Sequence, residues 1–140
     1  MRRIRASFIA MFAAFALIVI AEPSHASDGH VGAGPAGALG GMYVDFTGTY
    51  SANLSNISLQ DSKCDSHPVY MSLWATDTRG FHREVTDLYT NNWGCGSIRS
   101  FPNTSFGITQ PLANVRLMVC VQDWGLDTCR TSARLDNPYT

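Results

Sequence analysis

The sequence predicts an all-β fold, a small antiparallel β-sandwich or barrel stapled by two disulfides. Short segments alternate apolar and polar residues, and turn residues separate them at intervals of roughly 8–12 residues, which is typical of sandwiches and barrels. No segment shows the apolar spacing of an amphipathic helix. The four cysteines are even in number and all follow a leader-like segment, which favours a disulfide framework.

The first 26 residues have the three regions of a secretory signal peptide. Basic residues at 2–5 precede an apolar run from Ala6 to Ala21, and Ser24-His25-Ala26 is a cleavage tripeptide of small residues. An uncleaved membrane anchor is the alternative, but this run is shorter than the roughly 20 residues that span a bilayer. We therefore expect cleavage after Ala26 and a secreted, extracellular protein without membrane attachment.

Residues 27–41 hold six of the twelve glycines and no periodic apolar pattern. This composition predicts a flexible Gly/Ala-rich tail, followed by one β domain over residues 42–140.

The sequence without the leader has seven basic and ten acidic residues, which give a formal charge of −3. A mildly acidic surface with scattered arginines has no basic patch that would bind nucleic acid, so we expect no nucleic-acid partner. We also expect the protein to be a monomer.

The first half of the domain predicts two strand pairs. Apolar residues alternate over 42–54, and the alternation has changed parity at Ile57 and Leu59, which predicts a bulge near Ser55-Asn56. A polar loop over 61–68 leads to a strong strand at 69–76, and a turn at 77–80 returns the chain as a hairpin over 81–89.

The second half contains the cleanest strand pattern, after a loop at 90–96 and a short strand at 97–101. Val115, Leu117, Val119 and Val121 occupy every second position, and Gly125 marks the reversal of a hairpin. This hairpin would place Cys120 opposite Cys129, which leaves Cys64 to pair with Cys95. The cysteines lack zinc-site spacing, so we expect no metal and no cofactor. Residues 132–140 predict a closing strand.

Two tryptophans in predicted loops are the main candidates for binding. Trp93 and Trp124 lie beside glycines, with Asn92, Asp123 and Asp127 next to them. An indole with hydrogen-bonding groups at its rim suits recognition of an extracellular protein or a carbohydrate. The alternative is packing of these rings across a disulfide, and Trp74 is expected in or near the core.

Three other interpretations remain open. His82 and Glu84 would share one strand face, where Arg99 or Arg116 could complete the acid, base and cation of a small secreted ribonuclease, although a solvated face also explains them. The clamped loop 122–128 could inhibit a protease. Asp61, Asp65 and His67 could bind a cation, but turns held by their own side chains explain them better. We favour a binding protein over an enzyme.

Overall fold

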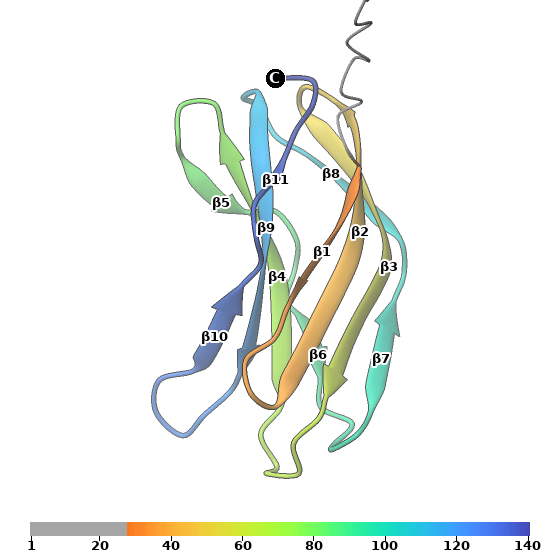
Figure 1. Ribbon diagram of the computed structural model, residues 1–140, viewed down its shortest axis with the longest axis vertical. Helices are drawn as coiled ribbons and strands as arrows, with labels where there is room; N and C mark the ends of the chain where they lie inside the picture. The colour runs from red at the N-terminus through yellow and green to blue at the C-terminus, as the bar shows by residue number, and fades with distance from the viewer. Residues whose placement is uncertain (1–27) are drawn as a thin grey trace, which may run out of the picture.

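The computed structural model describes residues 28–140 as two antiparallel β-sheets packed face to face (Figure 1). This arrangement confirms the all-β prediction and selects the sandwich. The described residues form no helix, so none of them offers a helix that could cross a membrane. The signal peptide predicted for residues 1–26 lies outside the described part.

The first sheet has the order β1-β2-β3-β7, and β8 also pairs with β3. The second has the order β10-β9-β4-β5, with β11 on β9 and β6 on β4. The bounds of the first sheet are β1 Gly29–Ala33, β2 Ala38–Gly48, β3 Ser51–Asp61, β7 Ile98–Phe101 and β8 Thr104–Gly107. Those of the second are β4 Val69–Asp77, β5 His82–Glu84, β6 Tyr89–Asn91, β9 Leu112–Val121, β10 Thr128–Thr131 and β11 Leu135–Asp136.

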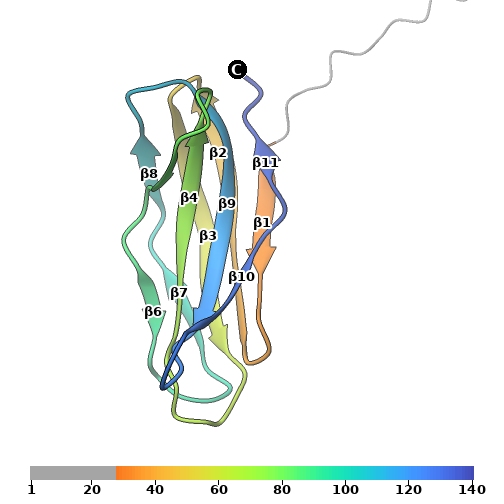
Figure 2. The same cartoon turned by 90° about the vertical axis from the view of Figure 1, so that its left-hand side faces the viewer.

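The core lies between the long strands β2 and β3 of one sheet and β4 and β9 of the other (Figure 2). The predicted alternation is confirmed on each of them, because alternate side chains point inward. Leu73 of β4 and Leu117 of β9, for example, are paired in register on neighbouring strands, and both are fully buried. Other buried core residues include Met42, Val44, Phe46, Leu54, Leu59, Val69, Met71, Val115 and Val119.

The predicted bulge is confirmed at Asn56, which has a φ of 51°. Gly41 pairs with Ser58, whereas Tyr43 pairs with Ser55, so β3 has one residue more than β2 between these pairs. The extra residue reverses which parity faces the core. Leu54 and Ile57 are therefore both buried, although they are three positions apart and a regular strand would place them on opposite faces.

The flexible tail predicted for residues 27–41 is wrong for its described part. This segment forms β1 and the start of β2, and β1 pairs over its whole length with residues 40–44 of β2. Glycine is needed here because the sheets approach closely: a Cβ on Gly40 would lie 2.8 Å from atoms of Met71 and Val119. A glycine-rich segment without alternating side chains can thus be a packed strand.

The predicted return strand over 81–89 is interrupted. β5 pairs with the end of β4, the chain leaves the ladder, and β6 pairs with the beginning of β4. The hydroxyl of Thr86 accepts a hydrogen bond from the backbone N–H of Leu73 at 3.0 Å. A side chain thus replaces a backbone acceptor in this gap. Trp74, expected in or near the core, lies half-buried on the outer face of β4.

Candidate functional site

Four connections meet at one end of the sandwich, opposite the C-terminus (Figures 1 and 2). We call this region the loop end. Both predicted disulfides are formed there: Cys64–Cys95 joins two of the connections, and Cys120–Cys129 closes a third. The loop end consists of residues 34–37, 62–68, 92–97 and 122–127.

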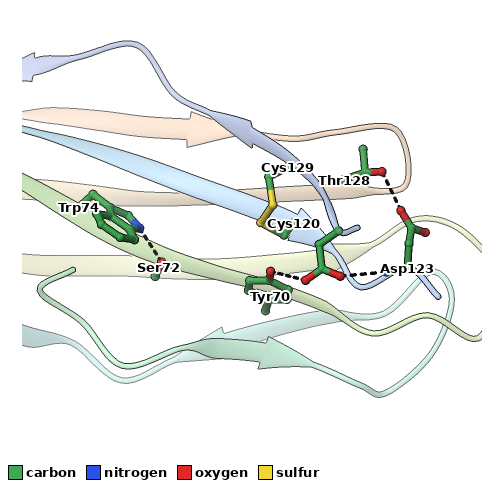
Figure 3. Close-up of a disulfide and its surroundings, with 8 residues drawn as sticks. Tyr70, Ser72, Trp74, Cys120, Asp123, Thr128 and Cys129 are labelled. Atoms are coloured by element: carbon green, nitrogen blue, oxygen red, sulfur yellow. Dashed lines mark hydrogen bonds between the residues drawn. A yellow bond between two sulfur atoms is a disulfide. The ribbon is translucent and has the colours of Figure 1, made fainter. Parts of the chain in front are cut away.

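The β9–β10 loop, residues 122–127, is held at both ends by its own contacts. Cys120 and Cys129 are directly opposite in the strand register. The hydroxyl of Tyr70 donates a hydrogen bond to Asp127 at 2.6 Å, and that of Thr128 donates one to Asp123 at 2.7 Å (Figure 3). These contacts fix the position of the loop relative to β4.

The apolar side chains of this loop point into solvent. Trp124 is 96% exposed and Leu126 is 94% exposed, and the chain bends over residues 124–126. Isolated exposed apolar residues are common, whereas here two almost fully exposed ones lie close together on one clamped loop. The prediction of a surface position for Trp124 agrees with this exposure.

His67 connects the Trp124 loop to the β3–β4 loop. Its ring meets the indole of Trp124 edge to face, with 5.9 Å between centroids. Its Nδ1 lies 3.3 Å from a carboxylate oxygen of Asp123 and 3.8 Å from one of Asp65. With Ser66, Pro68, Gln122, Asp123 and Trp124 it lines a small hollow of about 180 Å³.

The acidic residues of the β3–β4 loop act as turn formers, as expected. Asp61 accepts a hydrogen bond from the backbone N–H of Lys63, and Asp65 accepts one from that of His67. The ammonium of Lys63, hydrogen-bonded to Asp65, lowers the pKa of that carboxyl, and the His67 N–H adds to the effect. Within residues 28–140, no three His, Cys, Asp or Glu side chains are grouped to hold a metal.

Trp93 lies in the β6–β7 loop and is 66% exposed. The buried amide of Asn91 organises this loop: it donates to the carbonyls of Leu59 and Ser97 and accepts from the N–H of Trp93. The guanidinium of Arg99 lies 5.4 Å from the centre of the Trp93 ring. One face of this indole is therefore already occupied by a cation.

Asn92, the remaining predicted site residue, is exposed beside Trp93. It lines a second hollow of about 440 Å³ together with His67, so His67 borders both hollows of the loop end. The structure thus brings all five predicted binding residues and His67 to the loop end. The other residues of this second hollow are Asp61, Cys64, Ser66, Pro68, Gly94 and Cys95.

Sequence analysis missed three contributors to the loop end as binding or supporting residues. Leu126 gave no signal in the sequence, because it is a single apolar residue in a turn and the surrounding loops determine whether its side chain is exposed. The position of Tyr70 could have been predicted from the sequence, because the alternation along β4 places its side chain on the outer face of the sheet. His67 was considered only as a cation ligand, whereas it contacts the ring of Trp124.

The residues of the ribonuclease alternative are not brought into one hollow. His82 borders a hollow on the outer face of the second sheet with Arg116, whereas Glu84 borders a different one between β5 and the β7–β8 turn. Arg99 belongs to the other sheet and contacts Trp93. General acid–base catalysis requires both groups within hydrogen-bond reach of the same substrate.

Comparisons with known proteins add no assignment. No family model matches the chain, and no curated protein or solved structure is significantly similar to it.

Proposed function

We propose that this protein is a secreted binding module that recognises a protein partner by inserting Trp124 and Leu126 into an apolar pocket. The observation that carries this proposal is the near-complete exposure of both side chains on a loop clamped by a disulfide. Trp93, at the same end of the sandwich, extends the contact surface.

The clamped frame favours tight binding. A flexible loop loses conformational entropy when it binds, and a loop that is already ordered avoids most of that loss. Here the disulfide and the hydrogen bonds to Asp123 and Asp127 order the loop before a partner arrives. Tryptophan is also the residue type most enriched among the few that dominate interface energetics.

A protein suits this loop better than a carbohydrate does. Sugar sites place free hydrogen-bonding groups around a flat ring. The carboxylates beside Trp124 already accept hydrogen bonds from Tyr70 and Thr128, and the bend at 124–126 makes the loop convex. A partner pocket with an apolar floor and a basic rim would complement this loop.

The same bend argues against the protease-inhibitor alternative. An inhibitor that occupies a protease cleft like a substrate presents an extended segment, which pairs with the enzyme as an added strand. Residues 124–126 are bent instead. We therefore place the loop as an anchor in a pocket.

Secretion is part of the proposal. The two disulfides fit an extracellular protein, because thiols in the cytosol are kept reduced. The leader sequence supports export.

Affinity capture tests the proposed function. The protein, with both disulfides formed, is immobilised and exposed to the surface and medium proteins of its host, beside a Trp124→Ser variant and a Phe81→Ser variant. Phe81 is an exposed aromatic residue at the other end and serves as the matched control.

We expect one protein to bind the wild type and the Phe81→Ser variant, with affinity roughly 30-fold or more weaker for Trp124→Ser. Equal capture by all three would contradict the proposal, as would a partner whose affinity depends on Phe81 alone.

A further inference from the structure

A second candidate binding surface lies on the outer face of the second sheet, away from the tip of the Trp124 loop. It is a hollow of about 510 Å³ with walls from four adjacent strands, β5, β4, β9 and β10. The residues that line it are Trp74, Thr76, His82, Arg116, Met118 and Thr131.

Arg116 is the charged group of this hollow. It is exposed, and within residues 28–140 no hydrogen bond or ion pair joins it to another side chain. Arg116 and Glu84 both pair in register with Trp74, but from opposite sides, so two strand spacings separate them, roughly 10 Å. The planar fork of Arg116 is therefore free to bind a carboxylate with two hydrogen bonds.

Trp74 forms an apolar floor beside Arg116. Its indole N–H donates a hydrogen bond to the hydroxyl of Ser72 at 3.1 Å, which directs the ring along β4 (Figure 3). Ser72 points to the outer face, yet it is fully buried, so the indole covers it. The indole lines the hollow, and an aromatic ring in the wall of an open hollow can stack against a ring-shaped ligand.

Hydroxyl and imidazole groups surround this floor. Thr76 and His82 are a cross-strand pair, with the hydroxyl 2.8 Å from Nδ1 of the ring. Thr131 stands on β10 opposite Met118. A ring-shaped ligand on the indole would thus meet polar groups on both sides and a cation along one edge.

We infer that this hollow binds an acidic saccharide, with a uronic acid ring stacked on Trp74 and its carboxylate on Arg116. Sugar rings present an apolar face of C–H groups that fits an indole, and their hydroxyls match Thr76, His82 and Thr131. A neutral sugar would leave the guanidinium without a partner. The hollow is open and crosses four strands, which suits a unit within a longer chain.

Glu84 borders a different hollow but flanks this one, because it pairs with Trp74 on the side opposite Arg116. Its carboxylate repels that of the saccharide, so the acidic group is placed on the Arg116 side of Trp74. Replacement of Glu84 by Gln removes this repulsion. The ligand should bind to that variant somewhat more tightly.

The test is calorimetric titration of the disulfide-bonded protein with a galacturonic acid hexamer and with the same hexamer methyl-esterified. Esterification removes the charge and keeps the sugar rings. We expect the acidic hexamer to bind at least tenfold more tightly than the ester, and Arg116→Gln to abolish that difference.

Arg130→Gln is the matched control, because Arg130 lies on the neighbouring strand β10 and the change in net charge is the same. It should retain the preference for the acid. Equal binding of acid and ester, equal effects of the two arginine variants, or no binding to either hexamer would overturn the inference. Trp124→Ser should leave saccharide binding unchanged, so this site and the proposed protein-binding loop succeed or fail separately.

Discussion

The β9–β10 loop and the β4–β5 turn lie at opposite ends of the sandwich, and each carries an exposed aromatic ring (Figure 1). In the β4–β5 turn, residues 78–81, the guanidinium of Arg79 lies 5.2 Å from the centre of the Phe81 ring. In the β9–β10 loop, the rings of Trp124 and His67 meet edge to face, and Trp124 is 96% exposed. The Phe81 side chain is thus partly shielded and 63% exposed, whereas that of Trp124 is almost completely exposed.

The two connections also differ in how they are held. The β4–β5 turn depends on one carboxylate, Asp77, which is 2% exposed and accepts hydrogen bonds from Arg79 and from the N–H of Phe81. The β9–β10 loop depends on a disulfide and on Asp123 and Asp127 near the surface. A covalent clamp keeps the loop in place without burying its centre, so its apolar side chains stay available.

Removal of the Cys120–Cys129 disulfide should have the largest effect on stability. The Cys120→Ala, Cys129→Ala double variant no longer closes a loop of about 10 residues in the unfolded chain. We expect the free energy of unfolding to fall by about 3 kcal/mol, as measured by denaturant titration. An unchanged value would mean that the clamp does not stabilise the fold.

The second-largest effect should come from low pH, which should lower the stability that Asp77 gives to the β4–β5 turn. Burial raises the pKa of Asp77, but the hydrogen bonds from Arg79 and the backbone N–H of Phe81 outweigh it, so the net pKa is below its usual value. The stabilisation is therefore complete above the unfolded pKa of about 4 and is lost as the pH falls through the folded pKa. Asp77→Asn should be less stable than wild type at pH 7, and its stability should depend less on pH between about 5 and 2. Parallel curves for the two proteins would exclude Asp77 as the titrating group.

The Tyr70 to Asp127 hydrogen bond should contribute less. It raises the pKa of Tyr70 to about 12, with burial and nearby negative charge adding to the effect. The neutral phenol is favoured in the fold, so this stabilisation is present below pH 10 and is lost as the pH rises through 12.

Tyr70→Phe should lower the free energy of unfolding by about 1 kcal/mol at pH 7. Asp127→Asn should bring the spectrophotometric pKa of Tyr70 back toward 10. A tyrosine titration that this substitution does not change would contradict the assigned contact.

The smallest effect on stability should come from Trp124. Trp124→Ala should change the free energy of unfolding by no more than about 0.5 kcal/mol, because a side chain this exposed packs against little. Phe81→Ala should lower it by about 0.5–1 kcal/mol, since it loses the contact with Arg79. A larger loss for Trp124→Ala than for Phe81→Ala would show that the indole supports its own loop, and would remove the main argument for binding.

Alternation along the chain predicted the core faces of the long strands, and together with the spacing of turn residues it predicted the fold class. The predicted hairpin paired Cys120 with Cys129, and Cys64–Cys95 followed by elimination. A strand has only two faces, so the sequence of β9 specifies that Leu117 and Val119 point inward and Arg116 outward. The same logic located the bulge at Asn56 and the hairpin that pairs Cys120 with Cys129. These features depend on neighbours in the sequence, and local patterns record them.

Tertiary structure decided the rest, because it depends on which strands become neighbours in space. From the sequence, Gly40 was predicted to belong to a flexible segment. In the structure, atoms of Met71 and Val119 approach it so closely that a larger residue would not fit. Trp74 and Arg116 are 42 positions apart, and the register of β4 with β9 places them side by side. The exposure of Trp124 depends on how the β9–β10 loop lies against the β3–β4 loop, which carries His67, and no local pattern encodes how these two loops meet.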